Sequence, residues 1–355
     1  MPELVGLMKT TVSRASTSLK SLLPLVILLS VLFLIFIVSS LFVQKRRLSD
    51  EIKLNSIIAA KNFKEFEKLV KRQGTEKSYS LLKKAFAQNE PQAHDFAHIV
   101  GNAAYDQKKM QGISVCDSAF NYGCLHGFME AFLVVNDISN VGVVEKACED
   151  LGNLHSPSCL HGIGHGVMIE NSYEVGKALN DCHLLAQTSQ SYCFDGVFME
   201  RIVGSMLDDA AKIKLSEETI DSPCREIAYI YKAMCWRNQV NAWLIYFRAD
   251  TKAAGGRCLM VEPDFYDICF ESVGLNIAMN MPDTAKQVAD LCAFLPGGGV
   301  ADTCVIGTMK ELMFEGKSVD LAKSLCTVVS PAYMQFCFGI YSELDSQYQN
   351  RFKAT

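Results

Sequence analysis

Five of the seven histidines in this chain fall at two positions of a repeated sequence pattern. Aligned on a cysteine, the segments CLHGFME, CLHGIGH and CFDGVFME place these pairs two and six residues further on: His126 and Glu130, His161 and His165, Asp195 and Met199. The segment HDFAH supplies His94 and His98 at the same spacing without a cysteine. Residues four apart lie on one face of a helix. The pattern therefore predicts a row of imidazoles and carboxylates along neighbouring helices.

Imidazoles and carboxylates at this spacing are the residue types that hold a metal ion on helices of the H-E-x-x-H kind. Neighbouring helices pack about 8–10 Å apart and an imidazole binds zinc at about 2.0–2.1 Å, so adjacent repeats can share one ion. Such ligands would saturate one ion or hold two ions with open positions, and nitrogen and oxygen donors without thiolate suit Zn, Fe, Mn or Cu. We predict a metal centre between the first repeats, with these ligands: His94, His98, His126, Glu130, His161 and His165.

Further carboxylates accompany the predicted ligands. Asp95, Asp195 and Glu200 are expected to orient the imidazoles or to act as a general base. An ion with an open position would activate water or dioxygen, which predicts a metal-dependent oxidoreductase or hydrolase; no individual catalytic residue is identified. For any single histidine the alternative is a helix cap or a hydrogen bond across repeats. His155 and His183 lie off the pattern and are interpreted as loop or surface residues.

Small residues recur beside the predicted ligands on the same helices. They are Gly127, Gly162, Gly166 and Gly196, with Ala97 in the upstream segment. Glycine costs about 1 kcal/mol inside a helix, so its recurrence indicates that another group approaches the backbone closely there.

All 14 cysteines fall into seven short pairs. The first members recur about every 34 residues, which is the period of a helical repeat. No C-x2-C spacing of the kind found in zinc sites occurs among them, so local disulfides are predicted instead. The predicted disulfides join Cys116 to Cys124, Cys148 to Cys159, Cys182 to Cys193, Cys224 to Cys235, Cys258 to Cys269, Cys292 to Cys304 and Cys326 to Cys337.

Each unit has the pattern of two helices joined by a tight turn. An amphipathic run ends in the first cysteine, as in AKQVADLC, and a second run opens at the next cysteine, as in CFESVGLNIAMN. Stacked hairpins of this kind predict an all-α fold, a right-handed α/α solenoid with one disulfide inside each repeat. The segment from Ser78 has the same two-run shape without cysteines and is interpreted as a capping repeat. An insertion separates the third and fourth pairs.

This organisation resembles the cysteine-rich, Sel1-like branch of the tetratricopeptide-type repeat proteins. The resemblance rests on the paired cysteines and their period, and it covers roughly Ser78 to Phe352. It implies an array of helical hairpins in which a disulfide ties the two helices of each unit.

An apolar segment lies near the N-terminus. Residues 22–43 carry no charge and are long enough, as a helix, to cross a hydrocarbon core of about 30 Å. Basic residues flank both sides of this segment, so charge does not determine its orientation in the membrane. The disulfides do, because the domain that carries them needs an oxidising compartment. We expect a single-pass membrane protein whose repeat domain lies outside the cytoplasm, in the periplasm or at the cell surface. Its parts are a cytoplasmic tail (1–21), an uncleaved anchor (22–43), a helical stalk (44–77) and the extracytoplasmic repeat domain (78–355).

Two functions fit these features. The first is a membrane-tethered metal protein, and the second is a non-catalytic scaffold whose concave surface binds a protein, peptide or cell-wall partner. Nucleic acid is not an expected partner, because acidic and basic residues are interspersed at a net charge of −5.

Overall fold

The computed structural model describes residues 32–39, 52–86, 91–117, 119–120, 122–152, 156–207, 215–280, 282–293, 295, 298–314 and 318–353. The chain divides into two compact units, Met1–Asn62 and Phe63–Thr355. In the first unit, the described residues form helical turns at 32–39 and 52–59. No helix within the described part of the chain is both long and apolar enough to cross a bilayer, and the predicted anchor, 22–43, lies outside the described residues except at 32–39.

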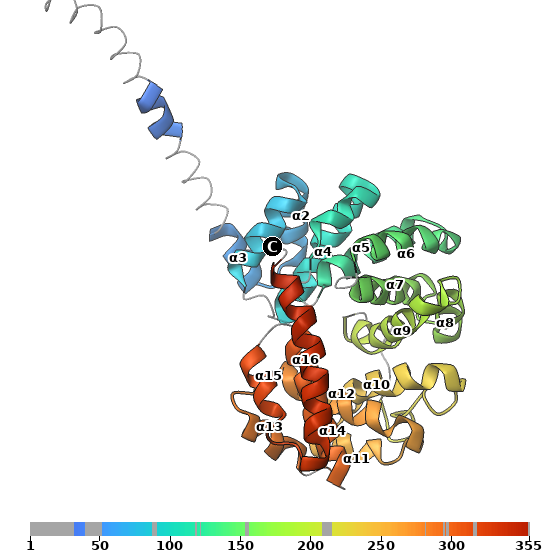
Figure 1. Cartoon of the computed structure of the whole chain (residues 1–355). Coiled ribbons are helices and arrows are strands. Elements are labelled where there is room, and N and C mark those ends of the chain that lie inside the picture. The colour runs from blue at the N-terminus through green and yellow to red at the C-terminus, as the bar shows by residue number, and fades with distance from the viewer. Residues whose placement is uncertain are drawn as a thin grey trace, which may run out of the picture. The chain divides into compact units, whose positions relative to one another are not determined.

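In the second unit, all regular structure of the described residues is helical, as the all-α prediction requires. The second helix of each predicted hairpin packs against the second helix of the next, and together they form a curved layer (Figure 1). In chain order this layer consists of α4 (Pro91–Lys108), α5 (Gly123–Val135), α7 (Ser156–Glu170), α9 (Gln187–Leu207), α10 (Tyr229–Tyr246), α12 (Tyr266–Met279), α14 (Gly298–Phe314) and α16 (Pro331–Lys353).

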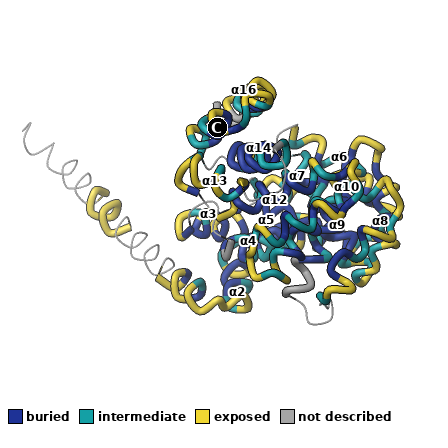
Figure 2. Tube along the Cα trace, turned by 90° about the horizontal axis from the view of Figure 1, so that it is seen from below, coloured by how far each residue is buried: buried dark blue, intermediate teal, exposed yellow. Residues whose placement is uncertain are grey.

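The first helix of each hairpin is shorter and packs against the second helix of its own hairpin, with α6, α8 and α13 at the periphery (Figure 1). The burial is concentrated along the helices of the layer (Figure 2). The shorter helices are α3 (Thr75–Ala85), α6 (Val141–Asp150), α8 (Val175–Cys182), α11 (Thr251–Cys258), α13 (Ala285–Cys292) and α15 (Val319–Leu325), with 3-10 helices at Lys109–Val115, Ile138–Asn140 and Pro263–Phe265.

All seven predicted disulfides are confirmed, and each joins the two halves of one hairpin. The Cα atoms of each pair are 5.3–5.8 Å apart, within the range that a disulfide bridges. The structure bonds Cys116 to Cys124, Cys148 to Cys159, Cys182 to Cys193, Cys224 to Cys235, Cys258 to Cys269, Cys292 to Cys304 and Cys326 to Cys337.

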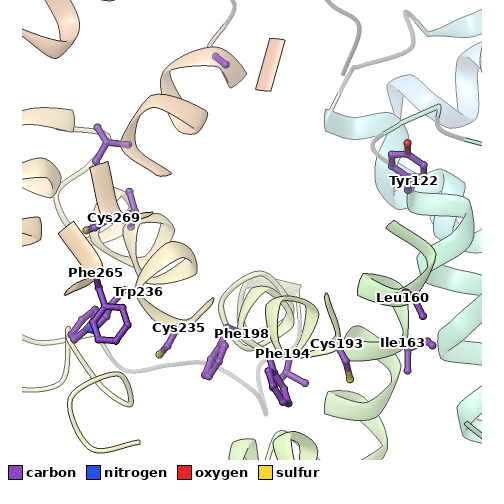
Figure 3. Packing of buried hydrophobic residues seen from close by; sticks show 14 of the residues in the cluster. Tyr122, Leu160, Ile163, Cys193, Phe194, Phe198, Cys235, Trp236, Phe265 and Cys269 are labelled. Atoms are coloured by element: carbon purple, nitrogen blue, oxygen red, sulfur yellow. The ribbon is translucent and has the colours of Figure 1, made fainter. Parts of the chain in front are cut away.

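The second cysteine of each pair lies in a long helix of the layer, and its side chain is buried. Cys124, Cys159, Cys304 and Cys337 lie in α5, α7, α14 and α16, and none of them is measurably exposed. Cys193, Cys235 and Cys269 lie among the buried aromatic and aliphatic side chains of the core (Figure 3). The disulfides therefore replace part of the apolar contact that the short first helices would otherwise need.

Two repeats depart from the predicted pair of α-helices. Cys116 follows the 3-10 helix Lys109–Val115, and Cys224 lies in the turns at 217–226. A Cβ at Gly112 would lie 2.2 Å from the Ala104 carbonyl oxygen, so glycine lets this segment fold back closely onto α4. Pro223 has no N–H to donate, which disfavours a helix interior next to Cys224.

The predicted capping repeat consists of α3 and α4, and aromatic contacts take the place of a disulfide there. Phe66, from the preceding helix α2 (Phe63–Gln73), packs its ring 5.0 Å from that of Phe96. Tyr79 of α3 packs against Phe120 at 6.1 Å and donates its hydroxyl hydrogen to Asp117. The predicted stalk, 44–77, therefore includes a helix, α2, that packs on α4 within the second unit.

The curved layer turns back toward its own beginning. The ring of Phe314, the last residue of α14, lies 5.8 Å from the ring of Tyr122, which precedes α5. Residues far apart in the sequence thus come into contact inside the curve.

Glycines let pairs of helices in the layer touch through their backbones. A Cβ at Gly127 of α5 would lie 2.1 Å from the His98 carbonyl oxygen of α4, and a Cβ at Gly196 of α9 would lie 2.0 Å from that of His161 in α7. Each contact has a second glycine on the other helix. A Cβ at Gly101 of α4 would collide with a backbone carbonyl of α5, and one at Gly164 of α7 would collide with a backbone carbonyl of α9. The predicted close approach is confirmed, and the approaching group is the neighbouring helix.

Comparing a substitution at one of these glycines with one at an exposed helical glycine separates the effect of packing on stability from the effect of helix propensity. Gly196→Ala places a methyl group against a backbone carbonyl, so we expect the free energy of unfolding to fall by about 1–3 kcal/mol. Gly176→Ala is the matched control, because a Cβ there has no heavy atom within 4 Å, and it should raise stability by up to about 1 kcal/mol. Denaturant unfolding under non-reducing conditions measures both. Equal effects of the two substitutions would contradict a backbone contact at Gly196.

Candidate metal centre

Three adjacent helices of the layer bring five histidines together. α4 supplies His94 and His98, α5 supplies His126, and α7 supplies His161 and His165. Their ligand atoms form two groups of three, each within 4.8 Å of one another, and His126 belongs to both groups. Helices with a repeat period of about 34 residues place these side chains side by side, as the sequence pattern predicts.

Four of the imidazoles are held at Nδ1 by an oxygen atom. Since a carbonyl or carboxylate oxygen only accepts, each Nδ1 carries the hydrogen and each Nε2 of the neutral ring is left with a lone pair. The acceptors are Phe120 O for His94 at 2.8 Å, Glu130 Oε1 for His98 at 2.9 Å, Asp195 Oδ2 for His161 at 2.9 Å and Glu200 Oε2 for His165 at 2.7 Å.

The free nitrogens then face one another in pairs. Nε2 of His94 lies 3.0 Å from Nε2 of His98, and Nε2 of His161 lies 3.0 Å from Nε2 of His165. Two lone pairs at this distance repel, unless a proton or a cation lies between them. Each pair is therefore an arrangement that a positive charge stabilises.

The spacing of the paired nitrogens is also that of two ligands on one ion. Two Zn–N bonds of about 2.0–2.1 Å at an angle between about 90° and 109° hold their nitrogens about 2.9–3.4 Å apart. The observed 3.0 Å falls in this range. The imidazole pairs could hold metal ions with little movement of the helices.

His126 is the exception among the five. It is 4% exposed, and its Nδ1 is buried without a hydrogen-bond partner among the described residues. Its ring stacks on that of His165 at 4.6 Å and lies 5.3 Å from that of His94. A buried polar atom of this kind costs free energy unless something binds it.

The carboxylates form an outer ring around the imidazoles. Asp195 and Glu200 orient His161 and His165, as predicted, and such partners fix the tautomer of a metal-binding histidine. Glu130, predicted as a direct ligand, lies on Nδ1 of His98, where it orients that ring in the same way. The charge of Asp95 acts on His98 as well.

The outer ring of carboxylates is supported by further residues, which the sequence alone did not identify. Tyr173 donates its hydroxyl hydrogen to Glu200 at 2.8 Å, and Asn238 donates an amide hydrogen to Asp195 at 2.7 Å. The Arg237 guanidinium lies 3.6 Å from Asp195. Arg237 occupies the same repeat position as His126 and His161, so the alignment on the second cysteine was a signal that it faces the centre.

Burial and neighbouring charge shift the pKa values of the imidazoles. Burial lowers the pKa of His94 to about 3, and burial and neighbouring imidazoles hold those of His126 and His165 well below the usual value. Burial also opposes the charging of His98, but the Glu130 carboxylate outweighs it and raises the pKa of His98. Most of these rings are therefore neutral, as a metal ligand must be.

The pKa values of the carboxylates diverge. Burial would raise the pKa of Glu130, but the charge and hydrogen bond of His98 lower it to about 2. Burial, reinforced by the charge of Glu130, raises the pKa of Glu200 to about 7. Burial opposes ionisation of Asp195 too, but Arg237 and His161 hold its pKa well below the usual range. The metal-free centre therefore keeps two of its carboxylates ionised at neutral pH.

Of the two remaining histidines, the structure describes His183, which lies apart from the centre. His183 is exposed and bonds to Gln190 and to the hydroxyl of Tyr231, which agrees with its interpretation as a surface residue. His155 lies outside the described residues.

The histidine positions of the repeat carry other groups in the later helices. Glu271 of α12 and Lys310 of α14 occupy them and form an ion pair at 2.5 Å. Both line a pocket of about 260 Å³, together with Arg237 and with apolar side chains such as Phe314. The later helices thus carry charged or apolar side chains where the early ones carry imidazoles.

Comparison with known proteins assigns no class to this fold. No family model, no curated protein and no solved structure matches the chain. The function of the chain is therefore argued from the geometry of the centre.

The shifted pKa values predict how the stability of the metal-free protein depends on pH. The pKa of His94 is about 3 in the folded chain and about 6.5 when unfolded, so the unfolded chain binds an extra proton between these values. His126 and His165 act in the same direction, and Glu130 adds to them below its ordinary pKa of 4.5. Glu200 opposes them only between pH 4.5 and about 7, where the folded chain holds the extra proton.

We therefore expect the free energy of unfolding to fall steeply as pH drops from 4.5 toward 3, where all these shifts agree in sign. Denaturant midpoints of the chelator-treated protein across this range measure the slope. His94→Asn should make the slope shallower, whereas His183→Ala, outside the centre, should leave it unchanged. A parent whose stability is flat between pH 4.5 and 3 would contradict neutral, buried imidazoles.

Proposed function

We propose that this chain is a membrane-anchored, extracytoplasmic protein of the right-handed α/α solenoid type that binds divalent transition metal between its first repeats. The observation that carries the proposal is the pairing of Nε2 atoms at 3.0 Å on α4 and α7, with Nδ1 of each ring held by an oxygen acceptor. A proton can lie between His94 and His98, because Glu130 raises the pKa of His98, but a cation accounts for the arrangement at both pairs.

The donor set narrows the choice of metal. The nitrogens that face inward are all imidazole, and no thiolate is available because every cysteine is in a disulfide. Imidazole suits Zn, Cu and Fe, whereas Mn prefers carboxylate and water. Zn, Cu or Fe is therefore the expected metal, with Glu130, Asp195 and Glu200 as orienting partners.

A bound ion would supply Lewis-acid chemistry toward water, or redox chemistry toward dioxygen if the ion is Cu or Fe. The protein groups around it would hold the imidazoles in one tautomer and exclude most solvent. Tyr173 and Glu200 form a hydrogen-bonded pair next to His165 that could accept or return a proton. These features support a metal-dependent oxidoreductase or hydrolase, or a metal-handling protein.

The compartment follows from the disulfides. Seven disulfides are stable in an oxidising environment, which supports an extracytoplasmic location. The uncharged segment 22–43 supports an anchor in the membrane with the short tail in the cytoplasm. The hairpins with internal disulfides support the proposed likeness to Sel1-type repeats.

Metal content tests the proposed centre. The full chain, purified in detergent without a histidine tag, should carry at least one Zn, Cu or Fe ion per molecule, measured by elemental mass spectrometry. His161→Ala/His165→Ala removes one imidazole pair and should lose at least half of that metal. The matched control His183→Ala should keep all of it. A parent without metal after supplementation with Zn, Cu, Fe and Mn would leave the alternative of a scaffold that binds a protein, peptide or cell-wall partner.

Membrane fractionation tests the proposed anchor. The full chain should stay with membranes after alkaline extraction, because an apolar helix of this length partitions into the bilayer. Deletion of 22–43 should release it in soluble form, if the disulfides are allowed to form. A full chain that remains in the soluble fraction would contradict the anchor without affecting the metal centre.

A further inference from the structure

His126 differs from the other four histidines because it lies between two similar histidine pairs. The pair on α4 and the pair on α7 have the same spacing in sequence and the same Nε2–Nε2 distance of 3.0 Å. α5, which carries His126, packs against both of these helices. The centre therefore consists of two chelating pairs with one imidazole between them.

The geometry favours two metal positions over one. Each group of three ligand atoms contains one complete pair and His126, and the two groups share no other residue. The ring of His126 lies 5.3 Å and 5.6 Å from those of His94 and His98. It lies 5.5 Å and 4.6 Å from those of His161 and His165. One ring is thus near enough to serve both pairs.

The nitrogens of His126 are also available for this role. The other four rings each engage Nδ1 with an oxygen atom, but Nδ1 of His126 is buried without a partner among the described residues. A Cβ at Gly162 of α7 would lie 3.2 Å from Cδ2 of His126, so glycine leaves room for the edge of the ring that carries Nε2. An imidazole with an unpartnered Nδ1 on one edge and space beside the edge that carries Nε2 can offer a nitrogen to each side.

We infer that the centre holds two divalent transition ions, one on each pair, and that His126 joins them as a bridging imidazolate. This inference rests on the proposed metal function. The neutral ring of His126 carries one N–H hydrogen, and binding of the second ion releases it to solvent as a proton while the nitrogen lone pair forms the new bond. No electron is transferred in this step.

The charges around the centre are compatible with two ions. Two divalent ions bring four positive charges into a largely buried site, where uncompensated charge is costly. Once Glu200 ionises, the imidazolate and the carboxylates of Glu130, Asp195 and Glu200 supply four negative charges around them.

Electron paramagnetic resonance with Cu²⁺ tests the bridge. Metal-free full chain in detergent, without a histidine tag, is titrated with Cu²⁺; free thiols do not interfere because all cysteines are paired. We expect the signal to rise up to one equivalent and to fall at two, since the two spins couple through the ring. Proton release should increase at the second equivalent.

Substitution of His126 provides the comparison. His126→Gln keeps a polar side chain of similar reach but cannot bridge, so it should show the signal of isolated ions at all loadings. His183→Ala is the control and should behave as the parent. Because the parent titration is informative alone, the test does not depend on how well the His126 variant folds.

The outcomes separate the two proposals. Saturation of the parent at one Cu²⁺, or two ions with the full uncoupled signal, would overturn the bridge but leave the metal function intact. Absence of any tight Cu²⁺ or Zn²⁺ binding would overturn the metal function itself.

Discussion

The contact of backbone on backbone between neighbouring helices is the constraint on which the histidine cluster depends. At Gly127 and Gly196 the adjacent helix comes so near that a methyl group would collide with a carbonyl oxygen. The carbonyls in question belong to His98 and His161, so at the α4–α5 and α7–α9 contacts the glycines set the distance between the helices at the level of the histidines. Rigid peptide groups determine these two spacings, whereas α5 meets Gly162 and Gly166 of α7 mainly through side chains.

The disulfides limit the movement of whole helices, and the outer carboxylates limit the rotation of single imidazole rings. Each disulfide fixes the start of a long helix against the end of a short one, and so limits how a helix of the layer can slide or rotate. The oxygen acceptors then fix the rotation of each ring about its own bonds. Together they hold the nitrogens in one orientation, which would lower the entropic cost of binding the proposed ion.

Much of this could be predicted from the sequence, because it depends on period alone. The spacing of the cysteines predicted the hairpins, and the alignment of the units placed five histidines on one row. The role of Glu130 could not be predicted, since whether a carboxylate meets a metal or the far nitrogen of a histidine depends on rotamers. Nor could the irregular segments before Cys116 and Cys224 be placed, although Pro223 disfavours a helix at the second of them.

The crossing of α12 and α14 has a consequence for how such arrays acquire chemistry. Gly274 and Gly307 bring these helices together as closely as the histidine-bearing pairs, with Cβ positions 1.9 Å and 2.2 Å from the opposing carbonyls. An ion pair between Glu271 and Lys310 takes one of these positions on each helix, so opposite charges are satisfied there without a cation. The helical platform is thus independent of the groups displayed on it: the same backbone contact carries two imidazoles on one helix near the start of the layer and an ion pair between two helices near its end.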